Sequence, residues 1–460
     1  MADPIRHRIA VLTKDLLGER MAGPAIRAFQ MARALAPDHD VILVSTVSCS
    51  LSVPEFRCVK AQGRELRALL SEVAVVVVQG YVAYDEPWLL SSDKIIVVDL
   101  YDPIQLEQLE QLKHAPPAEQ RLGVDLSVRV LNEQIARGDF FLCASQEQRH
   151  FWLGQLAAFG RINPSNYARD ATLESLIAIC PFGLSEVPPV HTRAAIRTVV
   201  PGIGAEDKLV LWAGGVYNWF DPLTLIRAVH RLRGTRPDVK LYFLGMKHPN
   251  PDIPEMAIAW RTRELAEELG LLGTTVFFNE GWVDYEDRQN YLLEADAGVS
   301  THHVHLETAF SFRTRILDYL WANLPIVSTG GDSFGELVDR AGLGVKVAEG
   351  DVEGLAAALD AVLYDEDVAQ RCRAAVARVR GDYTWPVALS ALTRFCADPR
   401  RAADAGRSQQ RILRLAALPR NRSLRRVLRA WSLLREGGLE LLARGARGYL
   451  ERTVRARRRS

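Results

Sequence analysis

The chain has 460 residues, 48% of them hydrophobic and 25% charged, and this length predicts two or three domains because one hydrophobic core would not suffice. Its six cysteines are scattered without a C-x-x-C pair, which argues against a disulfide scaffold and a zinc cage. No long apolar segment follows the N-terminus, and the longest apolar run, Val73 to Val78, is too short to span a membrane. We therefore expect a soluble protein of the cytoplasm.

The net charge of +1 hides a strong asymmetry between the C-terminal tail and the rest of the chain. Residues 401–460 contain 17 Arg, no Lys and four acidic residues, whereas the other 400 residues carry 40 basic and 52 acidic residues. A basic tail on an acidic body predicts a partner with negative charge.

The first part of the chain alternates short runs rich in Val and Ile with helical patterns such as 24–36 and 120–137. The runs are continuously apolar, which is typical of parallel strands buried on both faces. Alternation of this kind predicts a doubly wound α/β domain over residues 1–184. The predicted strands are 8–13, 41–46, 73–80, 95–99, 140–145 and 176–181.

Residues 185–207 contain three prolines and no clear strand, and we interpret them as an interdomain linker. The α/β alternation then restarts and predicts a second Rossmann-like domain over residues 208–383, followed by a helix, 384–400, that crosses back to the first domain. The predicted strands are 208–213, 239–245, 275–279, 297–301, 325–329 and 344–347, and the predicted helices are 222–232, 255–269, 285–295, 315–322 and 352–364. Ligands of such sheets bind beyond the carboxyl ends of the strands, so we expect the site between two facing domains.

Two loops of the first domain are candidates for ligand binding. Gly18 and Gly23 follow the first strand, and Pro24 suits the first turn of a helix whose free amides would bind a phosphate or sugar oxygen. An ordinary turn is the alternative, and the absence of G-x-G-x-x-G leaves a Rossmann dehydrogenase poorly supported. After the fourth long strand, Asp102 would orient an acceptor hydroxyl or stabilise charge on a sugar carbon, or would only begin a turn with Pro103.

The stretch with the most candidate residues is 301–338, where a loop containing His, Glu and Arg leads into a predicted helix. Arg313 and Arg315 in the first turn, with the helix amides, would bind a diphosphate. Asp318, one turn later, would accept two ribose hydroxyls. The three histidines of this loop have no second cluster of ligands, so we expect no metal site.

This stretch resembles the donor-binding motif of family-4-type retaining glycosyltransferases. That family has E-G-F-G-x-P, then L-L-E-A-M-A-x-G, then x-P-V-V-x-[ST], and this chain has F-S-F-R-T-R, then I-L-D-Y-L-W-A-N, then L-P-I-V-S-T at residues 310–329. SFGELV, the MAGPAIRAFQMARALAPDHDVILVS segment and GDYTWPVAL are similar to further family segments, so the resemblance runs through residues 8–397.

The resemblance implies a GT-B fold, an α/β fold of two Rossmann-like domains facing across a cleft. It implies a UDP-, GDP- or dTDP-sugar held mainly by the C-terminal domain, with Phe312, Arg313, Thr314, Arg315 and Asp318 at the donor. It also implies an acceptor held mainly by the N-terminal domain, retention of anomeric configuration, and chemistry that needs no bound metal or other cofactor.

The chain departs from the family pattern at two places. The paired acids Glu-x7-Glu fall on Phe310 and Asp318, so the first acid is lost, and Glu307 either replaces it or is an ordinary loop acid.

The second departure is the Arg and Lys clamp for the diphosphate, which is missing from the loop after residue 212. We expect Arg313, Arg315 and Lys247 to supply the charge, with Gly214 and Gly215 letting the backbone approach the phosphates. The neighbouring aromatic residues 219 and 220 either stack on a sugar or base or pack in the core.

Within the tail, residues 411–455 place apolar and Arg residues at helical spacing, which predicts an amphipathic helix on an anionic membrane surface. Docking on the acidic body and a disordered tail are the alternatives, and no nucleic-acid recognition motif accompanies the charge.

The sequence as a whole predicts a glycosyltransferase that moves a hexose-like sugar from a nucleotide diphosphate sugar to a glycan or lipid-linked glycan, in cell-envelope or surface polysaccharide synthesis. We place it in the cytoplasm, peripheral to the inner face of the cell membrane. The alternatives are a nucleotide-sugar epimerase and a non-catalytic GT-B module that binds glycan or scaffolds a complex.

Overall fold

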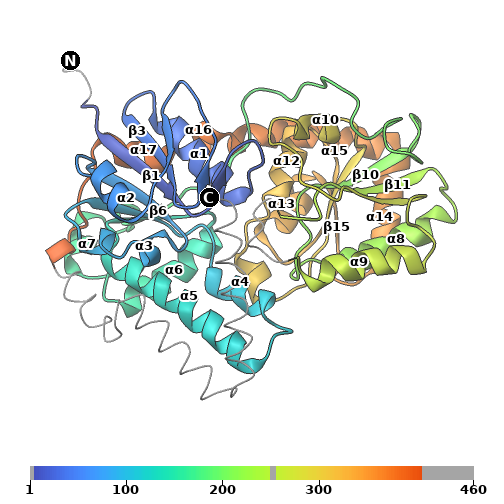
Figure 1. Cartoon of the computed structure of the whole chain (residues 1–460). Coiled ribbons are helices and arrows are strands. Elements are labelled where there is room, and N and C mark those ends of the chain that lie inside the picture. The colour runs from blue at the N-terminus through green and yellow to red at the C-terminus, as the bar shows by residue number, and fades with distance from the viewer. Residues whose placement is uncertain (1–4, 249–254, 407–460) are drawn as a thin grey trace, which may run out of the picture.

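The computed structural model describes residues 5–248 and 255–406, which form two α/β domains lying side by side (Figure 1). The N-terminal domain is built on a seven-stranded parallel sheet with the order β5-β3-β1-β6-β7-β8-β9. Its strands are β1 (Arg8–Thr13), β3 (Asp40–Ser45), β5 (Arg57–Lys60), β6 (Val75–Gln79), β7 (Ile95–Asp99), β8 (Phe140–Cys143) and β9 (Ile177–Ile179). The short strands β2 (Leu16–Leu17) and β4 (Ser48–Cys49) pair with each other beside it.

Helices cover both faces of this sheet, which explains why its central strands are apolar throughout. Every residue of β6 is buried. The helices are α1 (Gly23–Leu35), α2 (Gly63–Leu69), α3 (Val82–Asp85), α4 (Ile104–Gln111), α5 (Pro117–Arg137), α6 (Gln146–Ala158) and α7 (Pro164–Arg169), with a 3₁₀ turn η1 (Leu89–Ser91).

The C-terminal domain repeats the architecture on a six-stranded parallel sheet, ordered β12-β11-β10-β13-β14-β15. This is the strand order 3-2-1-4-5-6 of a Rossmann fold. Its strands are β10 (Lys208–Trp212), β11 (Val239–Phe243), β12 (Val276–Phe278), β13 (Ala297–Ser300), β14 (Ile326–Thr329) and β15 (Gly344–Val347). Its helices are α8 (Pro222–Arg233), α9 (Ala257–Glu268), α10 (Arg288–Leu293), α11 (Leu306–Phe310), α12 (Arg315–Trp321), α13 (Ser333–Ala341), α14 (Val352–Tyr364) and α15 (Glu366–Val379).

The prediction of two Rossmann-like, doubly wound domains is thus confirmed, and all the predicted strands form within about two residues of their expected ends. The strand β5 was not predicted, because its sequence RCVK is short and has a charged residue at each end. Charged ends are tolerated there because β5 is an edge strand that pairs only with β3.

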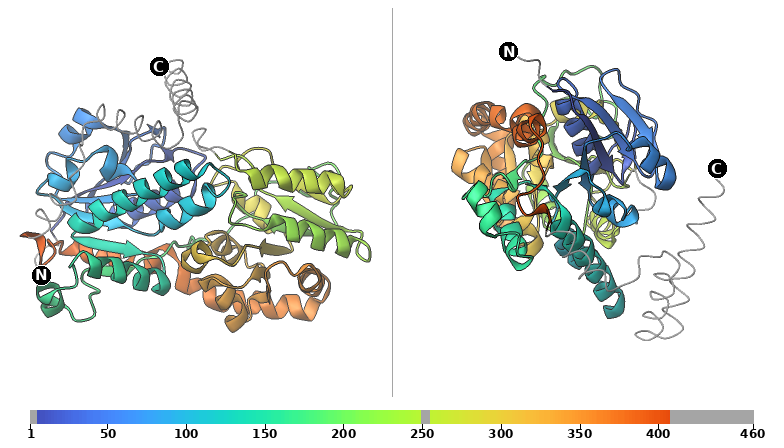
Figure 2. Two further views of the ribbon diagram at one scale, coloured as in Figure 1. Left: turned by 90° about the horizontal axis from the view of Figure 1, so that it is seen from below. Right: turned by 90° about the vertical axis from the view of Figure 1, so that its left-hand side faces the viewer.

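After α15 the chain crosses back beneath the N-terminal domain through η2 (Arg380–Tyr383), α16 (Trp385–Ala388) and α17 (Ser390–Ala397), as Figure 2 shows. Phe395 stacks on Phe140 with ring centroids 4.2 Å apart. Beyond α17, the fully buried side chains of Arg161 and Asp404 form an ion pair of 2.9 Å. Residues 401–406 therefore dock on the N-terminal domain, whereas the predicted amphipathic segment 411–455 lies outside the described residues.

The predicted linker 185–207 lies along the C-terminal domain. The carboxylate of Glu294, just after α10, accepts hydrogen bonds from the backbone N–H groups of Ala195 and Ile196 at 2.8 and 2.7 Å. Arg197 forms an ion pair with Asp296 at 2.7 Å. Within residues 5–248 and 255–406, no helix is both long and apolar enough to cross a membrane.

Candidate active site

The carboxyl ends of both sheets lead into loops that meet where the two domains touch. On one side of this junction, the loop after β1 contacts the loop after β12. The indole N–H of Trp282 donates to the carbonyl of Met21 at 3.3 Å, and the N–H of Tyr285 donates to the carbonyl of Glu19 at 3.0 Å. The glycine-containing loop that sequence analysis singled out is therefore held by the C-terminal domain.

On the other side of the junction, Gln148 and α4 connect the domains. The amide of Gln148 donates to the carbonyls of Tyr101 and Phe310, at 2.7 and 2.8 Å. Lys113, just after α4, donates to the carbonyl of Asn218 at 3.2 Å. The loops carrying Asp102 and Glu307 are consequently fixed against each other.

Arg313 is bound by the predicted site residue Glu307. The guanidinium makes two bonds to the Glu307 carboxylate, at 3.1 and 2.8 Å, and one to the hydroxyl of Thr308 at 3.2 Å. The side chains of Arg313 and Glu307 are only 5% and 9% exposed. This bidentate pair between a guanidinium and a carboxylate holds Glu307, in α11, beside the start of α12.

Arg315 has a different environment, because no carboxylate lies within ion-pair distance of it among the described residues. Its guanidinium lies between the rings of Trp212 and Phe220, at 4.2 and 3.9 Å from their centroids, and donates to the carbonyl of Gly215 at 2.8 Å. The residue is 7% exposed, and burial lowers the pKa of Arg315 to about 10. Arg315 therefore remains a buried cation at neutral pH.

Both arginines retain buried N–H groups without a hydrogen-bond partner, namely Nε of Arg313 and Nη1 of Arg315. Such groups are rare in folded proteins because leaving them unpaired costs about 1–3 kcal/mol. Both guanidiniums lie against the ring of Phe220, and the centroid of this ring is 4.9 Å from the guanidinium carbon of Arg313. The Nε of Arg313 lies 3.9 Å from a carboxylate oxygen of Asp332, whereas Arg315 has no carboxylate at ion-pair distance among the described residues. The unpaired donor of Arg315 therefore predicts an anionic ligand rich in oxygen.

The loop after β10 brings its backbone to this place. Gly214 has φ of +90°, a conformation that favours glycine, and a Cβ on Gly215 would lie 2.5 Å from the ring of Tyr217. Trp219 and Phe220 are 6% and 4% exposed and belong to the core of the C-terminal domain, as one of the two interpretations of these residues expected.

The remaining predicted donor residues lie around α12. Asp318 forms an ion pair of 3.2 Å with Arg288 of α10 and keeps a third of its side chain exposed. Thr314 is the N-cap residue of α12, and the Phe312 ring packs on Phe334 at 4.7 Å. Lys247 is exposed.

Gly23 begins α1, with Pro24 in its first turn as expected. The backbone N–H of Ala25 and that of Leu16 hydrogen-bond the carboxylate of Asp15, which is 8% exposed. A carboxylate of this chain therefore already occupies part of the α1 N-terminus, where sequence analysis expected a phosphate or sugar oxygen.

Carboxyl groups gather at the N-terminal side of the junction. Asp102 lies in the loop after β7, and Glu107 follows it in the first turn of α4. Burial raises the pKa of Asp102 to about 6, and burial and the charge of Asp102 raise the pKa of Glu107 well above its usual range. Glu307 adds a third carboxylate from the C-terminal domain.

Glu107, Arg288, Asp15 and Gln148 were missed by sequence reasoning. Glu107 had a local signal, since a helix beginning after Asp102-Pro103 places it in the first turn. The contacts of the other three join segments from different elements, and no short pattern in the sequence reveals them.

The side chains of the three histidines after β13 contact different partners. His302 is buried, bonds the carbonyl of Gly330 at 3.2 Å and has its pKa lowered to about 3 by burial, so its ring is neutral. His303 pairs with Glu349 at 3.0 Å, and His305 lies 3.7 Å from Glu110. Over the described part of the chain, no group of three His, Cys, Asp or Glu residues is placed to hold a metal ion.

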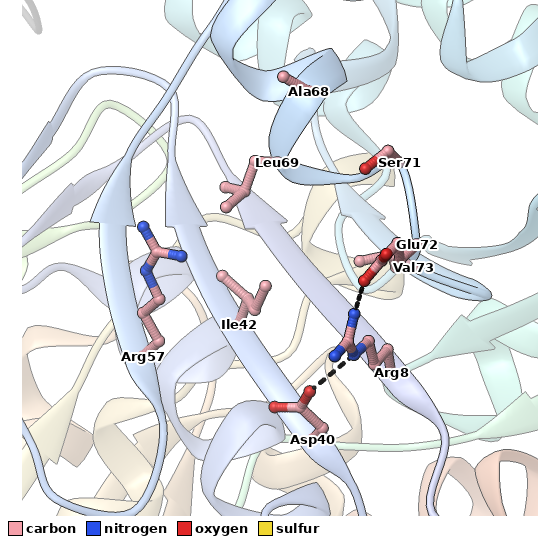
Figure 3. Close-up of a pocket in the computed structure, with 9 residues that line it drawn as sticks. All are labelled: Arg8, Asp40, Ile42, Arg57, Ala68, Leu69, Ser71, Glu72 and Val73. Atoms are coloured by element: carbon pink, nitrogen blue, oxygen red, sulfur yellow. Dashed lines mark hydrogen bonds and ion pairs between the residues drawn. The ribbon is translucent and has the colours of Figure 1, made fainter.

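A hollow of about 420 Å³ lies away from the junction, at the amino ends of β1, β3 and β5 (Figure 3). Arg8 crosses it and forms ion pairs with Asp40 and Glu72. Ligands of doubly wound sheets bind at the opposite, carboxyl ends, so this hollow is no candidate for the reaction site.

Comparison with known proteins gives a family match for the C-terminal domain. Residues 207–365 match the family model described as glycosyl transferases group 1. Glycogen synthase of Mycobacterium tuberculosis is 32% identical over 167 residues, which are 36% of this chain and 36% of that protein. The chain thus matches about a third of the length of this curated relative.

Two solved structures superpose on most of the chain. Sucrose-phosphate synthase from Thermosynechococcus elongatus has a TM-score of 0.61 at 16% identity, covering 85% of this chain and 98% of that one. Anabaena HepE, solved in complex with UDP-glucose, has a TM-score of 0.54 at 14% identity, covering 89% and 100%. The described chain therefore has the GT-B fold, and its C-terminal domain matches the group 1 glycosyl transferases.

Proposed function

We propose that this protein is a glycosyltransferase that moves a hexose-like sugar from a nucleotide diphosphate sugar to a hydroxyl of a glycan or lipid-linked glycan. The observation that carries the proposal is the pair of buried guanidiniums with unpaired N–H groups at the domain junction. A nucleotide diphosphate would supply the acceptor oxygens that these N–H groups lack and the negative charge that Arg315 lacks.

Arg315 is the first candidate for diphosphate binding. Arg313 is already bound by Glu307, whereas Arg315 has no carboxylate partner and lies against the carbonyl of Gly215 in the loop after β10. This is the loop from which the resembling family supplies its basic clamp. The positive charge of Arg315, in α12, therefore lies at the loop after β10, where the clamp residues are missing. There it would stabilise the departing diphosphate.

The nucleoside would then lie towards Asp318 and Arg288, with Asp318 accepting ribose hydroxyls. The sugar would lie towards Asp102 and Glu307, and Gly23, Lys247 and Thr314 stay predicted donor contacts. The proposal includes retention of anomeric configuration and a reaction that needs no metal. It also includes a role in envelope polysaccharide synthesis and attachment to an anionic membrane through residues 411–455.

The neighbours favour nucleotide sugars as the ligands to test first. HepE was solved with UDP-glucose, so UDP and its sugars head the series. If the diphosphate supplies the binding energy, UDP binds at least about 10-fold more tightly than uridine, because charge-assisted hydrogen bonds contribute about 1.5–3 kcal/mol each. The same difference is expected for GDP against guanosine, or dTDP against thymidine, if one of those is the donor nucleotide.

Isothermal titration calorimetry with each nucleoside and its diphosphate measures this difference. A diphosphate that binds no better than its nucleoside would contradict the assignment of Arg315. No binding by any nucleotide would favour a non-catalytic GT-B module, since two of the family's site features, the clamp and the first acid, are missing.

A further inference from the structure

Gln148 is a buried side chain of α6 whose orientation is determined by the start of its own helix. Residues 145–148 read S-Q-E-Q, a pattern of the capping-box type, and the hydroxyl of Ser145 accepts from the backbone N–H of Gln148 at 3.2 Å. The side-chain Oε1 of Gln148 accepts from the backbone N–H of Ala144 at 2.7 Å. Because this bond uses the oxygen, the amide nitrogen, with its two N–H groups, lies on the other side.

The amide nitrogen of Gln148 donates to one carbonyl of each domain. The carbonyl of Tyr101, in the loop after β7, lies 2.7 Å away, and the carbonyl of Phe310, at the end of α11, lies 2.8 Å away. The nitrogen has two N–H groups and finds two acceptors, so the side chain is satisfied only while both loops are in place. One buried amide therefore bridges the two domains.

The next turn of α6 contacts the same two loops. The indole N–H of Trp152 donates to the carbonyl of Leu100, in the loop after β7, at 2.9 Å. The ring of Phe151 packs on the ring of Phe310 with centroids 4.8 Å apart. Gln148, Phe151 and Trp152 share one side of the helix, because they are three and four residues apart. This side of α6 thus holds a loop of the N-terminal domain and a segment of the C-terminal domain together.

Position 310 is where the resembling glycosyltransferases have the first acid of their pair. In this chain Phe310 contacts α6 through both its ring and its carbonyl. The residue that replaces the acid is therefore engaged with the other domain. The candidate acids Asp102 and Glu307 lie one and three residues from the two carbonyls that Gln148 binds.

We propose that Gln148 is a positioning residue, which holds the loop that carries Asp102 against the donor sugar by bonding one loop of each domain. This inference rests on the proposed glycosyl transfer. The bond to Tyr101 fixes the loop of Asp102, and the bond to Phe310 fixes the segment that leads to Arg313. A displacement of about 1 Å between reacting groups costs on the order of 100-fold in rate. Gln148 touches neither substrate and acts through these two loops.

Replacement of Gln148 by glutamate removes both donors and keeps the shape of the side chain. The new side chain still accepts from the N–H of Ala144, so α6 begins as before, but an ionised carboxylate repels the two carbonyl oxygens that it faces. Gln148→Met, which is similar in length and uncharged, also removes both donors and replaces this variant if the buried carboxylate prevents folding. Gln146→Glu, at an exposed position in the same helical turn, is the matched control.

The bridge is tested without any substrate, by exchange of backbone amide hydrogens followed by mass spectrometry. In Gln148→Glu, peptides that contain residues 100–104 and 306–314 should exchange about 10-fold faster than in the wild type, because each loop has lost a hydrogen bond that opposes its opening. Gln146→Glu should leave both peptides unchanged. If both peptides exchange in Gln148→Glu and Gln148→Met as they do in the wild type, Gln148 does not hold the two loops.

The positioning role is tested by hydrolysis of UDP-glucose, with water as the acceptor and release of UDP as the readout. Gln148→Glu and Gln148→Met should lower kcat about 100-fold. The Kd of UDP, measured by calorimetry, should change less than about 3-fold, because Arg315 and Asp318 keep their contacts within the C-terminal domain.

Two results of this assay would overturn the positioning role. If kcat stays within about 3-fold of the wild type, the bridge does not serve the reaction. If kcat and the number of UDP binding sites fall together, Gln148 has a merely structural role. A wild-type protein that neither binds nor hydrolyses UDP-glucose would count against the proposed UDP donor, and amide exchange would still decide whether Gln148 holds the two loops.

Discussion

Replacement of Arg315 by methionine is expected to change stability and nucleotide affinity in opposite directions. The guanidinium is buried without a carboxylate partner, and burial lowers the pKa of Arg315 from its ordinary value to about 10. At about 1.4 kcal/mol per pKa unit, the charge costs the ligand-free protein on the order of 3 kcal/mol. Because the pKa stays far above neutrality, this cost is present at every pH from 5 to 9.

Methionine removes that cost but also the contacts of the guanidinium. The stacking on Trp212 and Phe220 and the hydrogen bond to Gly215 contribute about 1–2 kcal/mol together. We therefore expect Arg315→Met to raise the free energy of unfolding of the nucleotide-free protein by about 1 kcal/mol. The same variant is expected to weaken nucleoside diphosphate binding about 10- to 100-fold, because a charge-assisted bond to phosphate is lost.

Urea denaturation without nucleotide and calorimetry with UDP, GDP and dTDP measure the two effects. Arg371→Met, at an exposed position of α15, is the matched control and should change neither quantity. A variant that is destabilised by about 2 kcal/mol or more and binds its nucleotide like the wild type would show that Arg315 is a packing residue, and the diphosphate site would have to be elsewhere.

Three further outcomes follow from the contacts. Asp318→Ala should weaken donor-nucleotide binding about 10-fold without unfolding the protein, and unchanged affinity by calorimetry would remove Asp318 from the site. Because the pKa of Asp102 is raised to about 6, the folded state binds more protons than the unfolded state between pH 4 and 6, so the free energy of unfolding falls as pH rises through this window. Asp102→Asn should reduce that fall in urea titrations. If the dependence of the free energy of unfolding on pH is unaltered in the variant, the pKa of Asp102 is not raised. Asp404→Ala removes the carboxylate that pairs with the buried guanidinium of Arg161 and should lower the free energy of unfolding by about 3–5 kcal/mol in denaturant titrations, whereas a change below 1 kcal/mol would mean that residues 401–406 do not dock on the N-terminal domain.

Much of the fold was predictable because its physical cause is local. A parallel strand buried on both faces needs a continuous apolar run, and VVVVQ in β6 or IIVVD in β7 satisfies that need in five residues. The edge strand β5 lacked this pattern, since only one neighbour pairs with it. The strand order within each sheet depends on packing between distant segments, and it was assigned only as a fold class.

Many residues of the candidate site could be predicted from the sequence, but the ion pairs and hydrogen bonds between them could not. The Glu307–Arg313 pair joins residues six positions apart, yet the loop pattern gave no sign that one predicted site residue would bind another. The pairing of Asp318 with Arg288 spans 30 residues, and the contact of Gln148 with Phe310 spans 162. The first two contacts depend on how α10, α11 and α12 pack within the C-terminal domain, and the third depends on how the two domains meet. A short motif encodes neither.

We propose above that the domain junction binds a nucleotide diphosphate sugar. The most direct measurement is a thermal-shift series of the purified full-length protein with UDP, GDP, dTDP and their sugars, followed by calorimetry on any that respond. We expect one nucleotide class to raise the melting temperature, with a Kd on the order of micromolar, and we expect Arg315→Met to lose that rise. If no nucleotide raises the melting temperature of a protein that unfolds cooperatively, the junction is not a donor site and the protein is a GT-B module without one.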